Sequence, residues 1–262
     1  SSNYLHRMSH PDVEQENSAI EITFQIGALD IRTEAMLYLL FHLIKAPCFA
    51  TLRTKEQLGY TVWSGVKPEP CGVLSAWFIV QSKDWGPAHL DVRIEAFLET
   101  FRNEMLPTYG DKEEGGVEEE VEGGVEGEPI TTFEKNVRAC ISKWSEKDKT
   151  LSQRFGRFHT AITSNKAEHE FNTRFARARV LEDGVALEDV ANIFDRFIKK
   201  GSKERHKLSC HVVSSMHVAK DNSLINTNAD RIGDDMKSMD TWKASRTLFP
   251  SVISRPTPGA SL

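Results

Sequence analysis

The sequence lacks the features that mark several specialised classes of protein. Its four cysteines are scattered, with no C-x-x-C pair and no spacing typical of a disulfide framework: Cys48, Cys71, Cys140 and Cys210. We therefore expect reduced thiols, most of them in the core, as in an intracellular protein. No uninterrupted apolar run reaches about 18 residues, so we expect no membrane contact. Neither end carries a basic stretch followed by a short apolar run, so we expect no signal peptide.

Motifs of known catalytic centres are also missing. No G-x-S-x-G elbow, P-loop or G-x-G-x-x-G occurs in the sequence. The histidines nowhere form His-x-x-Glu-His or its inverse, which would place two imidazoles and a carboxylate base on one helical face. The closest approach is at His169, where Asn165 and Thr173 occupy the positions that a second histidine would need. We expect no metal site and no cofactor in this chain, and interpret four further histidines as ordinary helix, loop or strand residues: His42, His159, His206 and His211.

The negative charge is concentrated in one segment. Residues 111–128 hold nine carboxylates and one lysine, a local charge of −8, whereas the whole chain carries −5, so the remainder carries +3. The segment repeats GGVE twice and has no aromatic residue, so it cannot bury enough surface to offset its ordering entropy. We predict that 111–128 is a disordered insert. Elsewhere Lys and Arg are not concentrated along any element, which argues against a nucleic-acid partner.

Hydrophobic periodicity predicts an α+β domain, with a mostly antiparallel sheet and helices packed on one face. Residues 20–26 alternate as a half-buried strand, and a helix that is apolar nearly all round starts at about Ile31. Pro47 should kink that helix or separate it from a second one, which Gly59 can close. The remaining predicted elements are a hairpin of strands at 60–66 and 73–81, helices at 90–105, 133–144, 151–162, 171–178 and 190–198, and a strand at 207–213.

The same patterns divide the chain into three parts. Residues 1–17 are polar and without pattern, which is typical of a linker or fragment end. Residues 18–218 hold the predicted strands and helices and form the domain. Residues 219–262 are polar, with a small apolar group at 248–250, and are predicted to be a carboxy-terminal tail.

One segment, PCFATLRTKEQLGYTVWSG at residues 47–65, combines charged and polar residues at the end of a buried helix. Arg53 offers a five-donor fork suited to a carboxylate or a polarised carbonyl. Tyr60 could direct a phenolic donor at a developing oxyanion. The simpler alternative is that Arg53 forms a surface ion pair with Glu56, three residues on, and that Tyr60 is an ordinary strand aromatic.

This segment closely resembles the fourth domain of the insulin-degrading-enzyme-like (M16, inverted-zincin) metallopeptidases. The resemblance starts at NSAIEITFQIG and continues through GVLSAWFIVQS, VRIEAFLETF, TTFEKNVRACISKWSEKDKTLSQRF and HKLSCHVV, with a last echo in RTLFP. It is weaker at the acidic insert 111–128, at residues 164–184 and in the carboxy-terminal tail.

The resemblance implies a function that the chain would not perform alone. In this family four homologous domains enclose an unfolded peptide, and only the first domain holds zinc. Arg53 and Tyr60 match the arginine and tyrosine that assist the transition state from across the chamber. The implied partners are the amino-terminal half of the same protease, which would carry the zinc, and unfolded peptides. A cytoplasmic location is expected, although a targeting signal could lie on that half.

A second hypothesis is a catalytically inactive scaffold or peptide-binding subunit of the same superfamily. The retained arginine and tyrosine favour the protease, because a scaffold has no chemical need for that pair.

Overall fold

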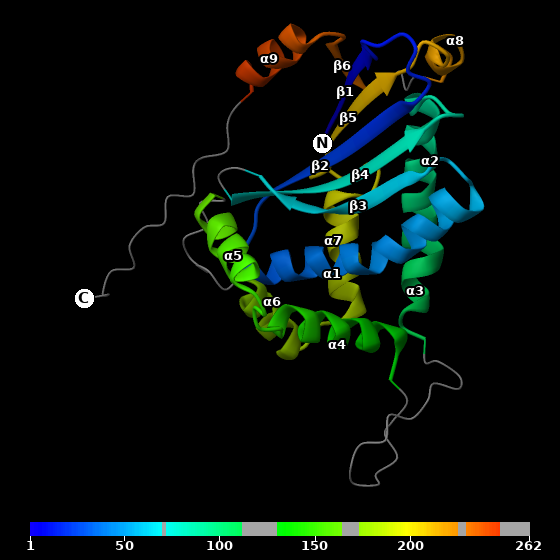
Figure 1. Ribbon diagram of the computed structural model, residues 1–262. Helices are drawn as coiled ribbons and strands as arrows, with labels where there is room; N and C mark the ends of the chain where they lie inside the picture. Colours follow the sequence, from blue (N-terminus) through cyan, green and yellow to red (C-terminus); the bar gives the residue numbers. More distant parts are fainter. Residues whose placement is uncertain (70–71, 112–129, 164–172, 225–228, 247–262) are drawn as a thin grey trace, which may run out of the picture.

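The computed structural model describes residues 1–69, 72–111, 130–163, 173–224 and 229–246. The strands form one mixed sheet in the order β3-β4-β2-β5-β1-β6 (Figure 1). They are β1 (Ser2–Ser9), β2 (Ser18–Ala28), β3 (Thr61–Pro68), β4 (Val73–Ser82), β5 (His206–Val213) and β6 (Asp230–Gly233). Strands β3, β4, β2 and β5 are antiparallel neighbours, whereas β1 runs parallel to both β5 and β6. The predicted α+β fold with a mostly antiparallel sheet is confirmed, with parallel pairing at one edge.

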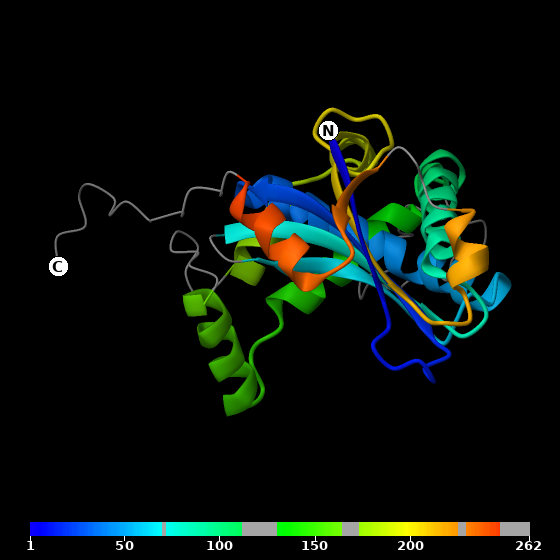
Figure 2. The same cartoon turned by 90° about the horizontal axis from the view of Figure 1, so that it is seen from above.

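Most helices cover one side of the sheet. Helices α1, α4, α6 and α7 lie on the same side, whereas α9 lies over the other side near β1 (Figures 1 and 2). Two helices continue into π-helical turns. Helix α1 (Ile31–Cys48) continues into η1 (Phe49–Lys55), and α2 (Pro87–Thr100) continues into η3 (Phe101–Met105), which is followed by the short helix α3 (Leu106–Thr108). The others are α4 (Thr132–Ser145), α5 (Leu151–Thr163), α6 (Thr173–Glu182), α7 (Leu187–Phe197), α8 (Val218–Asn222) and α9 (Met236–Ala244).

The core lies between the inner face of the sheet and α1. Ile22 and Phe24 of β2 and Leu40 of α1 are all fully buried. By length and composition alone the helix Ile31–Lys55 is apolar enough to cross a membrane, but it is more than half buried as the central helix of this domain. Its apolar character on nearly all sides follows from the α4, α6 and α7 contacts beneath it and the sheet above.

Cys48 and Cys140 are buried, free thiols of this core, and Cys210 is a partly buried free thiol on β5. Burial raises the pKa of Cys48 to about 12 and those of Cys140 and Cys210 to about 11. These thiols are therefore protonated at neutral pH and behave as small apolar side chains. The fourth cysteine, Cys71, lies outside the described residues.

The first segment differs from the prediction of a linker at residues 1–17, because Ser2–Ser9 form β1 between β5 and β6. The strand buries polar side chains as well as an apolar one. His6 and Arg7 are nearly as buried as Leu5. A hydrophobic alternation could not reveal this strand, because its burial depends on partners that lie more than 200 residues away in the sequence.

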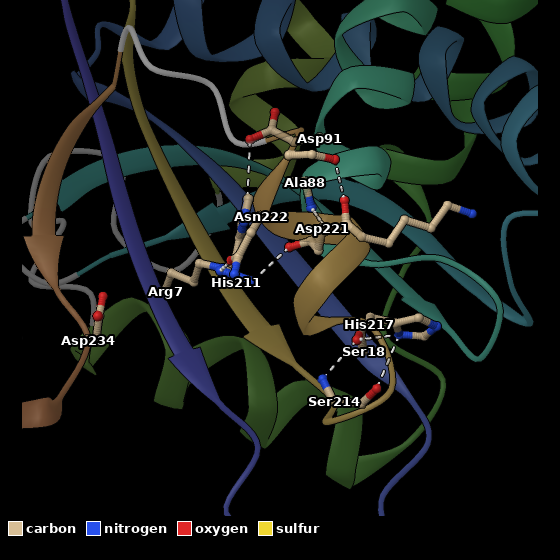
Figure 3. Close-up of polar contacts among 12 residues, drawn as sticks. Arg7, Ser18, Ala88, Asp91, His211, Ser214, His217, Asp221, Asn222 and Asp234 are labelled. Carbon is tan, nitrogen blue, oxygen red and sulfur yellow. Dashed lines mark hydrogen bonds and ion pairs between the residues drawn. The ribbon is translucent and has the colours of Figure 1, made fainter.

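The predicted polar tail at 219–262 contributes ordered elements: most of α8, together with β6 and α9. Asp221 of α8 is buried and accepts a hydrogen bond from the backbone N–H of Ala88, in the first turn of α2, at 2.7 Å. Its second carboxylate oxygen lies 3.1 Å from the guanidinium of Arg7, which also donates to Asn222 (Figure 3). α2 has no capping side chain at its own Gly86, so α8 provides the cap from a distance.

Two other predictions concern segments that lie wholly or partly outside the described residues. The acidic insert lies outside them from residue 112 onward, and so does Phe171 of the helix predicted at 171–178. The helix predicted at 151–162 is present as α5, but two members of its apolar stripe are exposed: Leu151 and Phe155 are 83% and 65% accessible.

Candidate functional site

The candidate site forms where the central helix ends and the edge strand β3 begins. Pro47 does not separate the helix from a second one, which was one of the two predicted outcomes. Instead α1 passes directly into η1, and the Glu56 N–H donates to the Thr51 carbonyl five residues back. The turn that ends the helix is at Gln57, with φ 51°, rather than at Gly59 as predicted. The Leu58 N–H then donates to the Leu52 carbonyl and closes the end of the helix.

Gly59 does not end the helix as predicted, but a close backbone contact requires glycine at this position. A Cβ atom at this position would lie 1.9 Å from the Gln81 carbonyl oxygen and 2.9 Å from its carbon. The chain therefore passes against the backbone of β4 at a distance that only glycine allows. Because Gly59 lies against β4, the position of the next residue, Tyr60, is fixed as well.

Arg53 and Tyr60, the two predicted site residues, lie in contact. The Arg53 guanidinium carbon is 4.6 Å from the centre of the Tyr60 ring and 4.7 Å from that of the Phe49 ring. The tyrosine is 85% accessible, so its phenol faces solvent rather than the core. The Arg53 guanidinium is thus within cation–π range of two rings, and no described side chain accepts a hydrogen bond from it.

The alternative ion pair between Arg53 and Glu56 is not formed. Glu56 instead accepts two hydrogen bonds from Arg93 of α2, from Nε at 2.7 Å and from the terminal nitrogen at 2.8 Å. None of the described carboxylates forms an ion pair with Arg53 or Lys55. As far as the described residues go, the site therefore presents positive charge without a paired carboxylate beside an exposed phenol, which suits a carbonyl oxygen or a carboxylate.

Sequence reasoning missed Phe49 and Arg93. Phe49 stands four residues before Arg53 on one helical turn, a spacing at which side chains meet, so the sequence did contain a signal. Arg93 carried no local signal, because it is on a different helix, 37 residues from Glu56.

The described residues do not fit a zinc ion. They contain no group of three or more His, Cys, Asp or Glu side chains placed to hold a metal. His42 is half-buried, and burial together with Lys143 lowers its pKa. His211 bonds Asp91 at 3.4 Å within an ionic cluster, and His217 bonds Ser18 at 2.9 Å (Figure 3).

The chain is similar in sequence to known proteins. Residues 39–114 match the family described as PQQ synthase PqqF-like, C-terminal lobe domain 4. The chain is 30% identical over 242 residues to the insulin-degrading enzyme of Drosophila melanogaster, covering 91% of this chain and 22% of the relative. It is 31% identical over 199 residues to the human insulin-degrading enzyme, covering 76% of this chain and 17% of that protein. The chain thus spans about a fifth of the length of the curated relatives it matches.

Solved structures agree on the fold. Pitrilysin superimposes with a TM-score of 0.61 at 16% identity, over 89% of this chain and 21% of that one. A peptidase M16 inactive domain from Pseudomonas fluorescens gives a TM-score of 0.53 at 9% identity, over 82% of this chain and 44% of that one. Identities this low establish the fold alone.

The fold is that of an M16 peptidase domain. Within that class, the chain matches the carboxy-terminal domain of insulin-degrading-enzyme-like proteins, as the sequence resemblance predicted.

Proposed function

We propose that this chain is the zinc-free carboxy-terminal domain of an M16-type zinc metalloendopeptidase, and that Arg53 and Tyr60 contact the peptide undergoing cleavage in an active site completed by the amino-terminal half. The chain forms part of the chamber wall and does not cleave peptides alone. The observation that carries the proposal is the Arg53 guanidinium, in contact with two aromatic rings and unpaired with any described carboxylate.

Each side chain would have a distinct task. The phenol of Tyr60 donates to the oxygen of the scissile carbonyl, where negative charge grows only as the transition state is reached. The guanidinium of Arg53 binds peptide carbonyl oxygens in the ground state as well as in the transition state. Zinc, when bound by the other half, would supply the activated water.

Kinetics of the complete protease test these tasks. Tyr60→Phe should lower kcat roughly tenfold to a hundredfold, with KM nearly unchanged, since zinc shares the stabilisation of the oxyanion. Arg53→Ala should lower kcat and raise KM. The 262-residue chain alone should hydrolyse no fluorogenic peptide.

The matched control variants remove the same chemical groups, a phenol and a guanidinium, at positions outside the site. Tyr4→Phe removes a phenol that contacts Arg246, and Arg138→Ala removes an exposed guanidinium on α4; both should keep parental kinetics. Unchanged kinetics for correctly folded Arg53 and Tyr60 variants would refute the assigned roles. Activity absent from the parent protease would favour the inactive scaffold instead.

A further inference from the structure

Among the described residues, the outer edge of β3 has no partner strand. β3 is the last strand of the sheet and pairs with β4 on its inner side only, from Thr61 to Pro68. In the described part of the chain, no backbone hydrogen bond outside the helices and ladders involves a β3 residue. Every second residue of this edge therefore presents an N–H and a carbonyl group away from the sheet.

Most of this edge lacks the protection that the opposite edge has. Soluble proteins guard free strand edges by making them short, charged or bulged, or by placing proline there. β6 follows that rule: it has four residues, exposes Asp230 and Arg231, and pairs with β1 through an irregularity in register. β3 has eight residues and an uninterrupted register; Lys67 and Pro68 guard only its carboxyl end, and residues 61–66 carry no charge and no proline.

Charge at the beginning of β3 indicates the chemistry of a partner. Arg53 touches Tyr60, the residue before the strand, and Lys55 is exposed in the same turn of η1. At the far end Lys67 is already paired with Glu21 at 3.0 Å and Glu69 at 3.4 Å. Within the described part of the chain, unsatisfied positive charge along β3 thus lies at the amino end of the strand, where it would attract a carboxylate.

We propose that the β3 edge binds an extended peptide as an added antiparallel strand, with a carboxylate near the peptide's carboxyl end on Arg53. Antiparallel pairing is the more stable arrangement, and in it the carboxyl end of the peptide lies at the beginning of β3, beside Arg53. This inference rests on the proposed function, because it uses Arg53 as a peptide contact and adds the backbone that positions the peptide.

Hydrogen exchange of the 262-residue chain tests the added strand. The probe is a soluble heptapeptide that alternates Thr and Val and ends in two Glu residues. At saturation it should slow exchange of the outward amides of 61–67 about tenfold or more, as expected for newly formed ladder hydrogen bonds. The amides of β6, the other edge, should not change. The same peptide with every amide N-methylated should neither bind nor protect.

A charge variant tests the carboxylate. Arg53→Ala should weaken binding of the probe about tenfold, the size of one charge-assisted hydrogen bond, while Arg138→Ala should leave it unchanged. A peptide with the two Glu residues at its amino end should bind more weakly than the probe. Equal binding of the two peptides would overturn the antiparallel direction.

Two results would overturn the added strand. One is probe binding with β3 amides unprotected, which would leave Arg53 a peptide contact without edge pairing. The other is concentration-dependent protection of β3 without peptide, which would assign the edge to a second copy of this chain. Failure of the proposed function is distinguishable: β3 would be protected as expected, while the kinetics of the Arg53 and Tyr60 variants of the full protease stayed parental.

Discussion

Single residues in the turn before β3 are under strong local constraint, and Gly59 shows it most clearly. Gly59→Ala would force its methyl group into the Gln81 carbonyl, so either η1 or β4 must move. We expect a loss of roughly 2–3 kcal/mol in the free energy of unfolding, the scale of overpacking a rigid site. Urea unfolding of the purified chain measures it.

Gly156 is the matched control for that substitution. It lies within α5, and no described atom lies within 4 Å of an added Cβ. Gly156→Ala should therefore stabilise by about 0.5–1 kcal/mol, because alanine loses less backbone entropy in a helix. If both variants shift stability equally, the contact with Gln81 is not what selects glycine at position 59.

Buried polar contacts join elements that are distant in the sequence. Among them, we expect the contact between α8 and α2 to have a large effect on the free energy of unfolding. Asp221→Ala removes the cap of α2 and leaves Arg7 buried beside an empty position. We expect a loss of about 3–5 kcal/mol, as for a broken buried ion pair. Asp235→Ala removes the exposed cap of α9 and should cost only about 1 kcal/mol. Equal losses in denaturant melts would contradict the cap's buried role.

A second buried cluster joins α2 to β5. Lys207, only 3% accessible, lies 2.5 Å from an Asp91 oxygen and 2.6 Å from Glu95, and His211 contacts the other Asp91 oxygen. Burial raises the pKa of Asp91, but hydrogen bonds from His211 and Lys207 outweigh it and hold the pKa well below its ordinary value. The folded state therefore favours the carboxylate.

This cluster should make stability fall in acid. Because the folded pKa of Asp91 is depressed, its contribution is complete above the unfolded pKa of about 4 and is lost as the pH falls below that value. Asp91→Asn should be less stable than the parent at about pH 7, and the difference should narrow toward about pH 3. Urea midpoints across this range check the sign. A difference that does not change with pH would remove Asp91 as its source.

The whole molecule should tolerate loss of the acidic insert. Across the insert, the Phe133 N–H donates to the Tyr109 carbonyl at 2.8 Å, so the flanking helices already meet. Replacing residues 112–128 with a short Gly–Ser linker should change the free energy of unfolding by no more than about 1 kcal/mol, since loop closure costs only about 0.6 kcal/mol per doubling of length. Thermal melts test this, and unfolding of the shortened chain would mean that the insert is structural.

The sequence by itself determined the elements whose side chains alternate or repeat on one face: β2, the β3–β4 hairpin, α1, α2, α7 and β5. In β2, α2 and α7 the buried side chains follow directly from the apolar period, whereas β5 buries Lys207, Ser209 and His211 and leaves its apolar Leu208 and Cys210 only half-buried. It also pointed to Arg53 and Tyr60 as candidate site residues, through the resemblance of the segment at 47–65 to the peptidase family.

Only the tertiary structure decided the rest. β1 and α8 bury Arg7 and Asp221, charged residues whose burial is favourable only once each has the other as a partner. Glu56 does not pair with Arg53 because it pairs with Arg93 instead, and no local sequence pattern connects Arg93 to Glu56. The free β3 edge depends on the order of strands across the whole sheet. Periodicity reports how a residue relates to its neighbours in the chain, whereas these features arise from pairings between distant segments.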